Sequence, residues 1–412
     1  MRKITYILSL VLMFSLPWED SISIPGLGSL ARLMGFVVAG FWLGTILLEG
    51  KFRKLNLFHA LVLLFLLWNF LSVFWSLDVE GTLQRIKTYS QIFLLMLIYW
   101  EVFQKPEELM AGLQAYIFGA YILVGSTIYN YLAGNVAVQY EGRYSATGVN
   151  ANDVALILIL GLPIGVSVAL ELLFVARRNI KGILLQVINF LYIPLSIFSI
   201  VLTGSRTSLI AIIPFIILMI GTQRIKVERK ILIIVILLVS LLALFPFVPQ
   251  TMINRLGTTG NSISEADLGG RVNLWREGIA LLAKHSVLGI GGGAIDHTIG
   301  AAVHNTFISV ATETGFIGLV FFLSILGLVV YKVVRLPTRT SGLWWAVFMT
   351  WMIGVLTLSW EFRKFTWIIL SFVIIESSFG EQVGEQERNI SFSGGIRRSL
   401  EAGQSVSQPK VI

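Results

Sequence analysis

The sequence predicts an all-α, polytopic integral membrane protein with one long outward-facing loop. The 412-residue chain is 56% hydrophobic and 13% charged, whereas a soluble globular protein carries about 25% charged residues. Apolar runs recur along nearly the whole chain, and several of them approach the roughly 20 residues that a bilayer crossing needs. Short polar connectors separate these runs, except for one long polar stretch over residues 249–305.

Each expected transmembrane helix corresponds to one apolar run, which makes about twelve helices in all. The first run follows Met1-Arg2-Lys3 and resembles a signal peptide, but Pro17-Trp18-Glu19-Asp20 offers no small-residue cleavage site, so we expect an uncleaved helix. Pro194 and Pro214 are expected to kink their helices, as membrane proteins tolerate. The expected spans are 4–16, 30–48, 57–75, 89–103, 109–132, 154–174, 183–202, 209–220, 231–248, 306–334, 343–358 and 365–378.

The chain divides into a transmembrane helical domain over residues 1–379 and a short C-terminal tail over residues 380–412. The tail is rich in Gly, Ser, Gln and Glu and has too little apolar surface to fold, so we expect it to be disordered. No internal repeat is visible in the sequence. In particular, there is no pair of interrupted helices at matching places in two halves, which would indicate a transporter.

The basic residues predict the orientation in the membrane. With the N-terminus in the cytoplasm, most of the 31 lysines and arginines fall on the cytoplasmic side, as the positive-inside rule requires. Both termini are then cytoplasmic, and the 249–305 loop faces outward. Because the basic residues lie between apolar runs rather than in one solvated patch, the formal charge of +8 indicates membrane topology and not a nucleic-acid partner.

Two outward-facing arginines are candidates for binding an anion. Arg206 lies in the tight turn Gly204-Ser205-Arg206 between two spans. One interpretation is an interfacial arginine that extends toward lipid headgroups, and the other is a guanidinium that holds a phosphate in a bidentate manner. Arg271 begins a segment whose apolar residues recur at helical spacing, so it would stand at a helix N-terminus, where anions are favoured.

Neither of two other motifs in the loop predicts a bound ligand. The glycine run over residues 288–293 lacks the strand and helix context of a dinucleotide or nucleotide site, so a turn is the better interpretation. Glu265 and Asp267 are explained as a solvated helix cap rather than a metal pair. The chain has no cysteine, which excludes disulfides and thiolate metal sites. We therefore expect no metal and no cofactor.

His304 is the candidate general base. It directly precedes the helix expected from Thr306, and an unperturbed imidazole titrates near pH 6.5, which suits proton transfer from a hydroxyl group. Glu313 follows about two and a half turns later and on the opposite face of that helix. A carboxylate at that depth either has a function or forms a structural hydrogen bond to a neighbouring helix, and we expect the second.

Together these stretches resemble the O-antigen ligase and O-antigen polymerase family of bacterial envelope proteins. The matching motifs lie within about residues 140–335, and the arrangement of apolar runs and loops resembles the family over the whole chain. Ala151 and Ser286 depart from the family pattern, which usually has proline at both positions. The matching motifs, in chain order, are Gly148-Val149-Asn150-Ala151-Asn152-Asp153, Gly204-Ser205-Arg206, Gly270-Arg271 with Trp275, His285-Ser286-Val287-Leu288-Gly289-Ile290-Gly291, and His304-Asn305 followed by Glu313-Thr314-Gly315.

The resemblance implies a metal-independent glycosyltransferase of the bacterial inner membrane with its site facing the periplasm. The donor would be a glycan linked to polyprenyl diphosphate, such as undecaprenyl diphosphate, and the acceptor a lipid A core sugar in lipopolysaccharide biosynthesis. By family position, Arg206 and Arg271 would bind the diphosphate, with Arg143 and Arg276 as additional candidates, and His304 would act as the general base. Fixed arginines stabilise a leaving diphosphate without a metal ion.

Two alternatives remain at this stage. A polymerase of the same family would extend a lipid-linked glycan instead of transferring it to a lipid A core. A transporter or channel for an anionic lipid or sugar would need ionisable groups along a transmembrane path, whereas the middles of the expected spans are almost free of charge. The gathering of polar groups on one face favours the enzyme.

Overall fold

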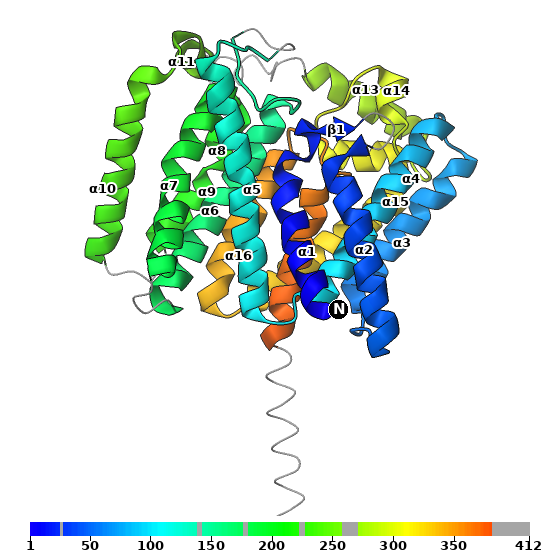
Figure 1. Cartoon of the computed structure of the whole chain (residues 1–412). Coiled ribbons are helices and arrows are strands. Elements are labelled where there is room, and N and C mark those ends of the chain that lie inside the picture. Colours follow the sequence, from blue (N-terminus) through cyan, green and yellow to red (C-terminus); the bar gives the residue numbers. More distant parts are fainter. Residues whose placement is uncertain (25–27, 138–141, 176–179, 222–226, 258–270, 381–412) are drawn as a thin grey trace, which may run out of the picture.

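A computed structural model of the chain describes residues 1–24, 28–137, 142–175, 180–221, 227–257 and 271–380. Nearly all of these residues are helical, which confirms the all-α prediction (Figure 1). A single two-residue antiparallel pair, β1 (Ser23–Ile24) with β2 (Gly28–Ser29), is the only sheet within these ranges. The tail predicted from residue 380 falls, beyond that residue, outside the described part of the chain.

Helices occur at the places where apolar runs predicted them. The longer ones are α1 (Arg2–Ser15), α2 (Leu30–Glu49), α3 (Leu57–Leu71), α4 (Val79–Val102), α5 (Pro106–Leu132), α6 (Ala151–Val175), α7 (Ile180–Thr203), α10 (Val227–Leu244), α13 (Arg271–Lys284), α15 (Thr306–Arg335), α16 (Thr338–Val355) and a last helix over 364–380. The shorter ones are η1 (Leu16–Ser21), η2 (Ser72–Phe74), α8 (Arg206–Ala211), α9 (Ile213–Gly221), η3 (Phe245–Phe247), α11 (Gln250–Gly257) and α14 (Ile295–Ile299).

Six helices of the described chain are long and apolar enough to cross a membrane. They are α2, α3 with the turn that follows it, α5, α6, α7 and α15. The chain is therefore a multi-pass membrane protein, while the expected total of about twelve crossings stays a prediction. The most buried of the six is α6, which packs against α5, α7 and α16 and whose most apolar window is 100% buried.

The fourth helix begins earlier in the structure than the sequence predicted. We expected a helix from residue 89, but α4 begins at Val79, because Asp78 caps it by accepting a hydrogen bond from the backbone N–H of Gly81 at 3.1 Å. The additional turns place Arg85 inside the helix with 8% of its surface exposed. Such a buried guanidinium needs a counter-charge.

The span predicted over residues 209–220 is divided. One short helix, α8, ends at Ala211, and α9 begins at Ile213 with Pro214 as its second residue. Proline fits the first turn of a helix but interrupts a continuous one, because it lacks the N–H that an interior position requires. The break lies close to Arg206, which begins α8.

The polar stretch of residues 249–305 folds into helices where it is described. The predicted amphipathic segment is α13, which packs against α15 and not along a free surface. At their contact the hydroxyl of Thr312 donates to the carbonyl of Gly278 at 3.0 Å. Residues 258–270, which include Glu265 and Asp267, lie outside the described residues.

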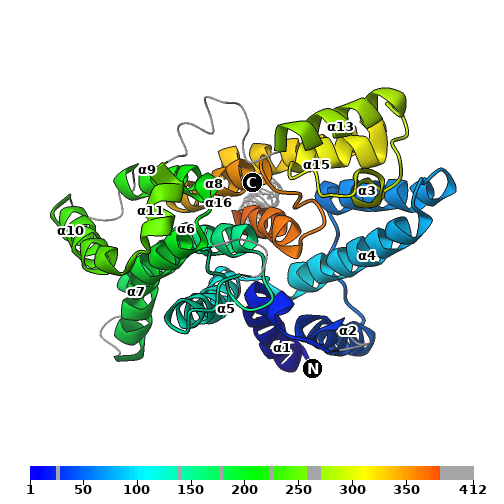
Figure 2. The same cartoon turned by 90° about the horizontal axis from the view of Figure 1, so that it is seen from above.

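The two ends of the bundle differ in character. The N-terminus and the end of helix 364–380 lie at one end, and α11, α13 and α14 lie at the other (Figure 1). Seen from above, helix 364–380 stands in the middle of the molecule, with α1 and α2 on one side and α8 and α13 on the other (Figure 2). The candidate site lies at the end that carries α13.

Candidate functional site

His304 occupies a special backbone position. Its φ is +55°, and among the described residues it is the one non-glycine residue with a positive φ. The next residue, Asn305, caps α15, since its side-chain oxygen accepts from the N–H groups of Phe307 and Ile308 at 3.0 and 3.1 Å. The amide nitrogen of Asn305 also donates to the carbonyl of Leu356 at 3.1 Å. These bonds hold the chain on the C-terminal side of His304.

The segment after α16 provides a second anchor. The hydroxyl of Thr306 donates to the carbonyl of Leu358 at 2.8 Å and accepts from the N–H of Trp360 at 2.8 Å. Together with the Asn305 bond, these contacts tie the first turn of α15 to residues 356–360. The position of His304 is thus determined by two segments that are far apart in the sequence.

The surroundings of the imidazole favour its neutral form. Burial lowers the pKa of His304 below its ordinary value of 6.5, and the positive charge of Arg271 lowers it further, while Asp153 and Asp296 act in the opposite direction. A side chain that is neutral at pH 7 has a free ring nitrogen. Such a group accepts a proton from a nearby hydroxyl, as a general base must.

Arg271 and the turn around Arg206 border the same small pocket. Arg271 is the first residue of α13 and lines this pocket, as do Ser205 and Thr207 on either side of Arg206. Asn152, from the motif before α6, lines it as well. The structure therefore brings Arg271, the Arg206 turn and His304 into one region, although they are separated by up to about a hundred residues along the chain.

The two additional candidates for diphosphate binding, Arg143 and Arg276, differ in how far they are buried. Arg143 is 2% exposed, and its guanidinium donates to the carbonyl of Thr203 at 2.6 Å and to the side-chain oxygen of Asn152 at 2.9 Å. It joins the end of α7 to the start of α6. Arg276 is exposed on α13 and does not line the pocket.

An apolar groove lies below this pocket. It has a volume of about 840 Å³ and is lined by residues of α6, α9 and α16. Ile213 and Ile353 line the groove, and each lies close in sequence to a residue of the small pocket, Ala211 and Gly354 respectively. The groove thus lies close to the residues of the small pocket, and it has room for a hydrocarbon chain.

Asp153 connects the motif before α6 to the segment after α16. Its carboxylate accepts from the indole N–H of Trp360 at 2.8 Å and from Arg363 at 2.8 Å. Arg363 also pairs with Asp20, at 2.8 Å, near the end of the first helix. Sequence reasoning did not identify Arg363, because its partners lie more than two hundred residues away.

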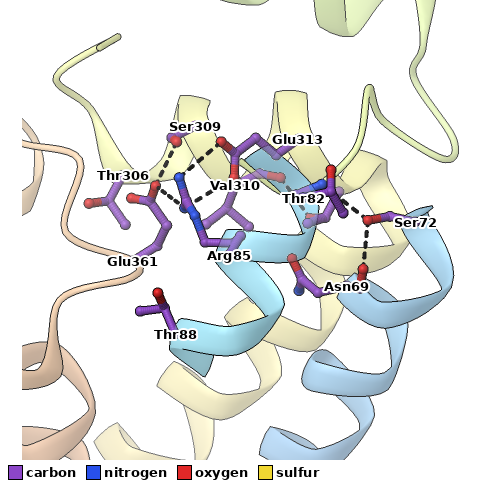
Figure 3. A network of polar contacts seen from close by, with 12 residues as sticks. Asn69, Ser72, Thr82, Arg85, Thr88, Thr306, Ser309, Val310, Glu313 and Glu361 are labelled. Atoms are coloured by element: carbon purple, nitrogen blue, oxygen red, sulfur yellow. Dashed lines mark hydrogen bonds and ion pairs between the residues drawn. The ribbon is translucent and has the colours of Figure 1, made fainter. Parts of the chain in front are cut away.

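A buried charge cluster stands next to this segment (Figure 3). The guanidinium of Arg85 lies 3.3 Å from a carboxylate oxygen of Glu313 and 3.0 Å from one of Glu361, and the hydroxyl of Ser309 donates to Glu361 at 2.8 Å. Glu313 and Glu361 are 1% and 0% exposed. The expected hydrogen bond from Glu313 to a neighbouring helix is present as an ion pair, but Arg85 and Glu361 were not predicted from the sequence.

The glycine run is a packed turn. Gly289, Gly291 and Gly293 all have positive φ, which glycine adopts without strain. The N–H of Gly291 donates to the carbonyl of Glu313 at 2.9 Å, and a Cβ on Gly289 would stand 2.3 Å from that carbonyl oxygen. These contacts occur where α15 is broken at Gly315, whose φ is +66°. The run therefore supplies backbone partners to a broken helix and not to a phosphate.

Comparison with known protein families matches one segment of the chain. The model of the O-antigen ligase family matches residues 191–323, about a third of the chain. The matched segment contains Arg206, Arg271, Arg276 and His304, and it excludes Arg85, Arg143 and Glu361. No curated protein matches the chain.

Proposed function

From the premise that the chain belongs with the O-antigen ligases, an assignment that the match over residues 191–323 supports, we propose that it transfers a polyprenyl-diphosphate-linked glycan to a lipid A core sugar. The observation that carries the proposal is the convergence of Arg271, the Arg206 turn and His304 above an apolar groove. That arrangement offers cations for a diphosphate, a base for a hydroxyl and space for a prenyl chain.

The donor would lie with its diphosphate against Arg206 and Arg271 and its prenyl chain in the groove between α9 and α16. Guanidinium groups bind phosphate oxygens in a bidentate manner. They are fixed before the reaction, so they stabilise the charge that develops on the diphosphate as its bond to the sugar breaks. In this proposal the arginines supply the charge stabilisation without a metal ion.

His304 would take the proton from the acceptor hydroxyl. The freed oxygen attacks the anomeric carbon of the donor glycan, a new glycosidic bond forms, and the bond from that carbon to the diphosphate oxygen breaks. Polyprenyl diphosphate leaves with the electron pair, and the imidazolium of His304 releases its proton to water. A lowered pKa suits this role, because the resting imidazole is already neutral.

The test is transfer of a purified polyprenyl-diphosphate glycan to lipid A core in detergent with EDTA present. We expect wild-type protein to transfer the glycan and His304→Ala and Arg271→Ala each to reduce the rate by about 10²-fold or more. Lys284→Ala, at the exposed far end of α13 from Arg271, is the matched control and should retain the rate.

Three results would change the proposal. Lengthening of the lipid-linked glycan with no transfer to the core would replace the ligase with a polymerase that uses the same site. Dependence of the rate on a divalent cation would contradict the arginine-based mechanism. Wild-type rates in His304→Ala or Arg271→Ala would contradict the roles given to those residues.

A further inference from the structure

A second pocket is lined by residues near the start of α2 and in the middle of α4. In Figure 2, α1 and α2 lie on the opposite side of helix 364–380 from α8 and α13. The pocket has a volume of about 260 Å³ and polar walls. The elements that form it are η1, β1, β2, the start of α2, the middle of α4 and residues 362–364 at the start of the last helix. The residues used below are Glu19, Asp20, Arg32, Gln91, Arg363 and Lys364.

An apolar slot of about 50 Å³ adjoins this pocket. It lies between α1, α2 and α4, and its walls include Leu16, Gly35, Phe36 and Leu95. Arg32, Gln91 and Lys364 line both spaces. The pocket and the slot are therefore one amphipathic site, polar at the end of the bundle that carries α13 and apolar farther in.

The charges of the pocket leave one cation available. Lys364 pairs with Glu19, and Arg363 pairs with Asp20 at 2.8 Å. The guanidinium of Arg32 is exposed and has no ion pair with any described residue. An unpaired guanidinium beside a pocket attracts an anionic group such as a phosphate. Gln91 and the paired carboxylates add acceptors and a donor for hydroxyl groups.

The slot is open at one particular position. A Cβ added to Gly35 would meet no atom within 4 Å, and Gly35 is a helical residue of α2 that lines the slot. The neighbouring Phe36 is 57% exposed. The slot therefore opens at the side of the helix bundle, where a lipid could reach it directly from the membrane.

The pocket is connected to the candidate site through one residue. Arg363 lines the pocket and also donates to Asp153 at 2.8 Å. Asp153 in turn is held by Trp360, whose backbone bonds to Thr306 two residues after His304. A headgroup in the pocket would thus lie across the 360–363 segment from the proposed base.

We propose that this pocket and slot bind an anionic lipid, with its headgroup at Arg32 and one hydrocarbon chain beside Gly35, and that this lipid is the acceptor of the transfer. The second part rests on the proposed function. Donor and acceptor then approach His304 from opposite sides of helix 364–380, each with its hydrocarbon chain in a separate apolar space. This arrangement keeps the two lipids from competing for one groove.

Binding is tested with purified protein in detergent by native mass spectrometry, with phosphatidylglycerol and phosphatidylcholine as probes. We expect wild type to retain phosphatidylglycerol in preference to phosphatidylcholine. Gly35→Leu, which fills the slot, and Arg32→Gln, which removes the cation, should each weaken retention of phosphatidylglycerol about tenfold, the scale of losing one charged hydrogen bond.

Gly40→Leu is the matched control, because Gly40 lies on the same helix, does not line the slot and also has open space around its Cβ. It should bind phosphatidylglycerol as wild type does. Equal retention of the two phospholipids by wild type, or equal weakening in Gly35→Leu and Gly40→Leu, would show ordinary boundary lipid and overturn the site.

The acceptor role has its own measurement. In the transfer assay, Gly35→Leu and Arg32→Gln should raise the KM for a lipid-anchored acceptor about tenfold and leave the KM for the donor unchanged. With the same acceptor glycan freed of its lipid, Gly35→Leu should equal wild type. A raised donor KM would assign the slot to the donor and overturn the acceptor role. Absence of transfer by wild type would contradict the proposed function, while the binding measurement would still decide the lipid site.

Discussion

At the scale of single residues, the backbone of His304 is the most informative feature of the site. A non-glycine residue at a φ of +55° costs of the order of 1 kcal/mol, and it persists only when the surrounding structure imposes it. Here the surrounding bonds are those of Asn305 to Leu356 and of Thr306 to Leu358. Strain of this kind is common at functional sites, because it holds a reacting group in place.

The pKa of His304 predicts the pH dependence of transfer. A general base works only in its neutral form, and the neutral form of His304 dominates above a pKa that lies below 6.5. We therefore expect the rate to rise with pH through a midpoint below 6.5 and to be level at neutral pH. The measurement is a pH–rate profile of transfer with saturating donor and acceptor.

Two variants sharpen that profile. Asp296 raises the pKa of His304, so Asp296→Asn should move the midpoint to lower pH and leave the level rate unchanged. Asn tolerates the left-handed backbone, so His304→Asn should fold as wild type does and lose about 10²-fold in rate. A rate that falls as pH rises from 5 to 7, or an unmoved midpoint in Asp296→Asn, would exclude His304 as the base that the profile reports.

At the scale of elements, the break in α15 explains several separate motifs. Gly315 interrupts the helix, and the N–H of Phe316 donates to the carbonyl of Ser286 at 2.8 Å. The N–H groups of Ile290 and Gly291 donate to the carbonyls of Thr312 and Glu313. Buried backbone groups need partners, and non-helical backbone at membrane depth is tolerated only where protein covers it. The glycine-rich turn and the Glu313-Thr314-Gly315 motif are thus hydrogen-bonded to each other at the break in α15.

The cluster of Arg85, Glu313 and Glu361 connects the broken region of α15 to α4 and to the segment after α16. Removal of the cation leaves two buried carboxylates without a counter-charge, so Arg85→Met should lower the free energy of unfolding by about 3–5 kcal/mol. Replacing all three charges, in Arg85→Met with Glu313→Gln and Glu361→Gln, removes the uncompensated charge. That triple variant should be closer to wild type than the single one.

Unfolding of the purified protein by sodium dodecyl sulfate in mixed micelles measures this free energy. Lys87→Met is a suitable control, because Lys87 lies on the same helix and is exposed. A single variant as stable as wild type, or a triple variant less stable than the single one, would show that the three charges do not form one energetic unit.

At the scale of the whole molecule, the two ends of the bundle predict an orientation. The N-terminus and the C-terminal end of α2 lie at the end of the bundle opposite α13 (Figure 1). Lys51 follows the last residue of α2, Glu49, by two positions, whereas Lys284 ends α13 itself. Basic residues near the ends of spans favour the cytoplasmic side, so we expect the N-terminus inside and α13 outside. The chain has no cysteine, which makes single-cysteine labelling direct.

In intact spheroplasts, Lys284→Cys should react with a membrane-impermeant maleimide, and Lys51→Cys should react only after the membrane is permeabilised. Both positions are exposed, so detergent-solubilised protein should label at either one. Labelling of Lys51→Cys in intact spheroplasts, with Lys284→Cys protected, would reverse the orientation and place the candidate site in the cytoplasm.

The sequence by itself determined the features that depend on local composition and periodicity. Apolar runs predicted the helices, because a chain in a bilayer must satisfy its backbone hydrogen bonds within each segment. The 3.6-residue period predicted α13, and ordered motifs predicted the O-antigen ligase assignment that the match over residues 191–323 supports. The roles of His304 and Arg271 stay predictions.

Only the tertiary structure decided which distant groups meet. Arg85 looked like a connector residue, and it became a buried partner of Glu313 and Glu361 because α4 begins ten residues earlier than its apolar run. Arg143 was an additional candidate for binding the diphosphate, and the structure shows it buried and hydrogen-bonded to Thr203 and Asn152. The physical reason is the same in both cases. The sequence does not distinguish a charged side chain that faces water from one that faces a polar or charged partner. The packing of the helices determines which of the two the side chain contacts.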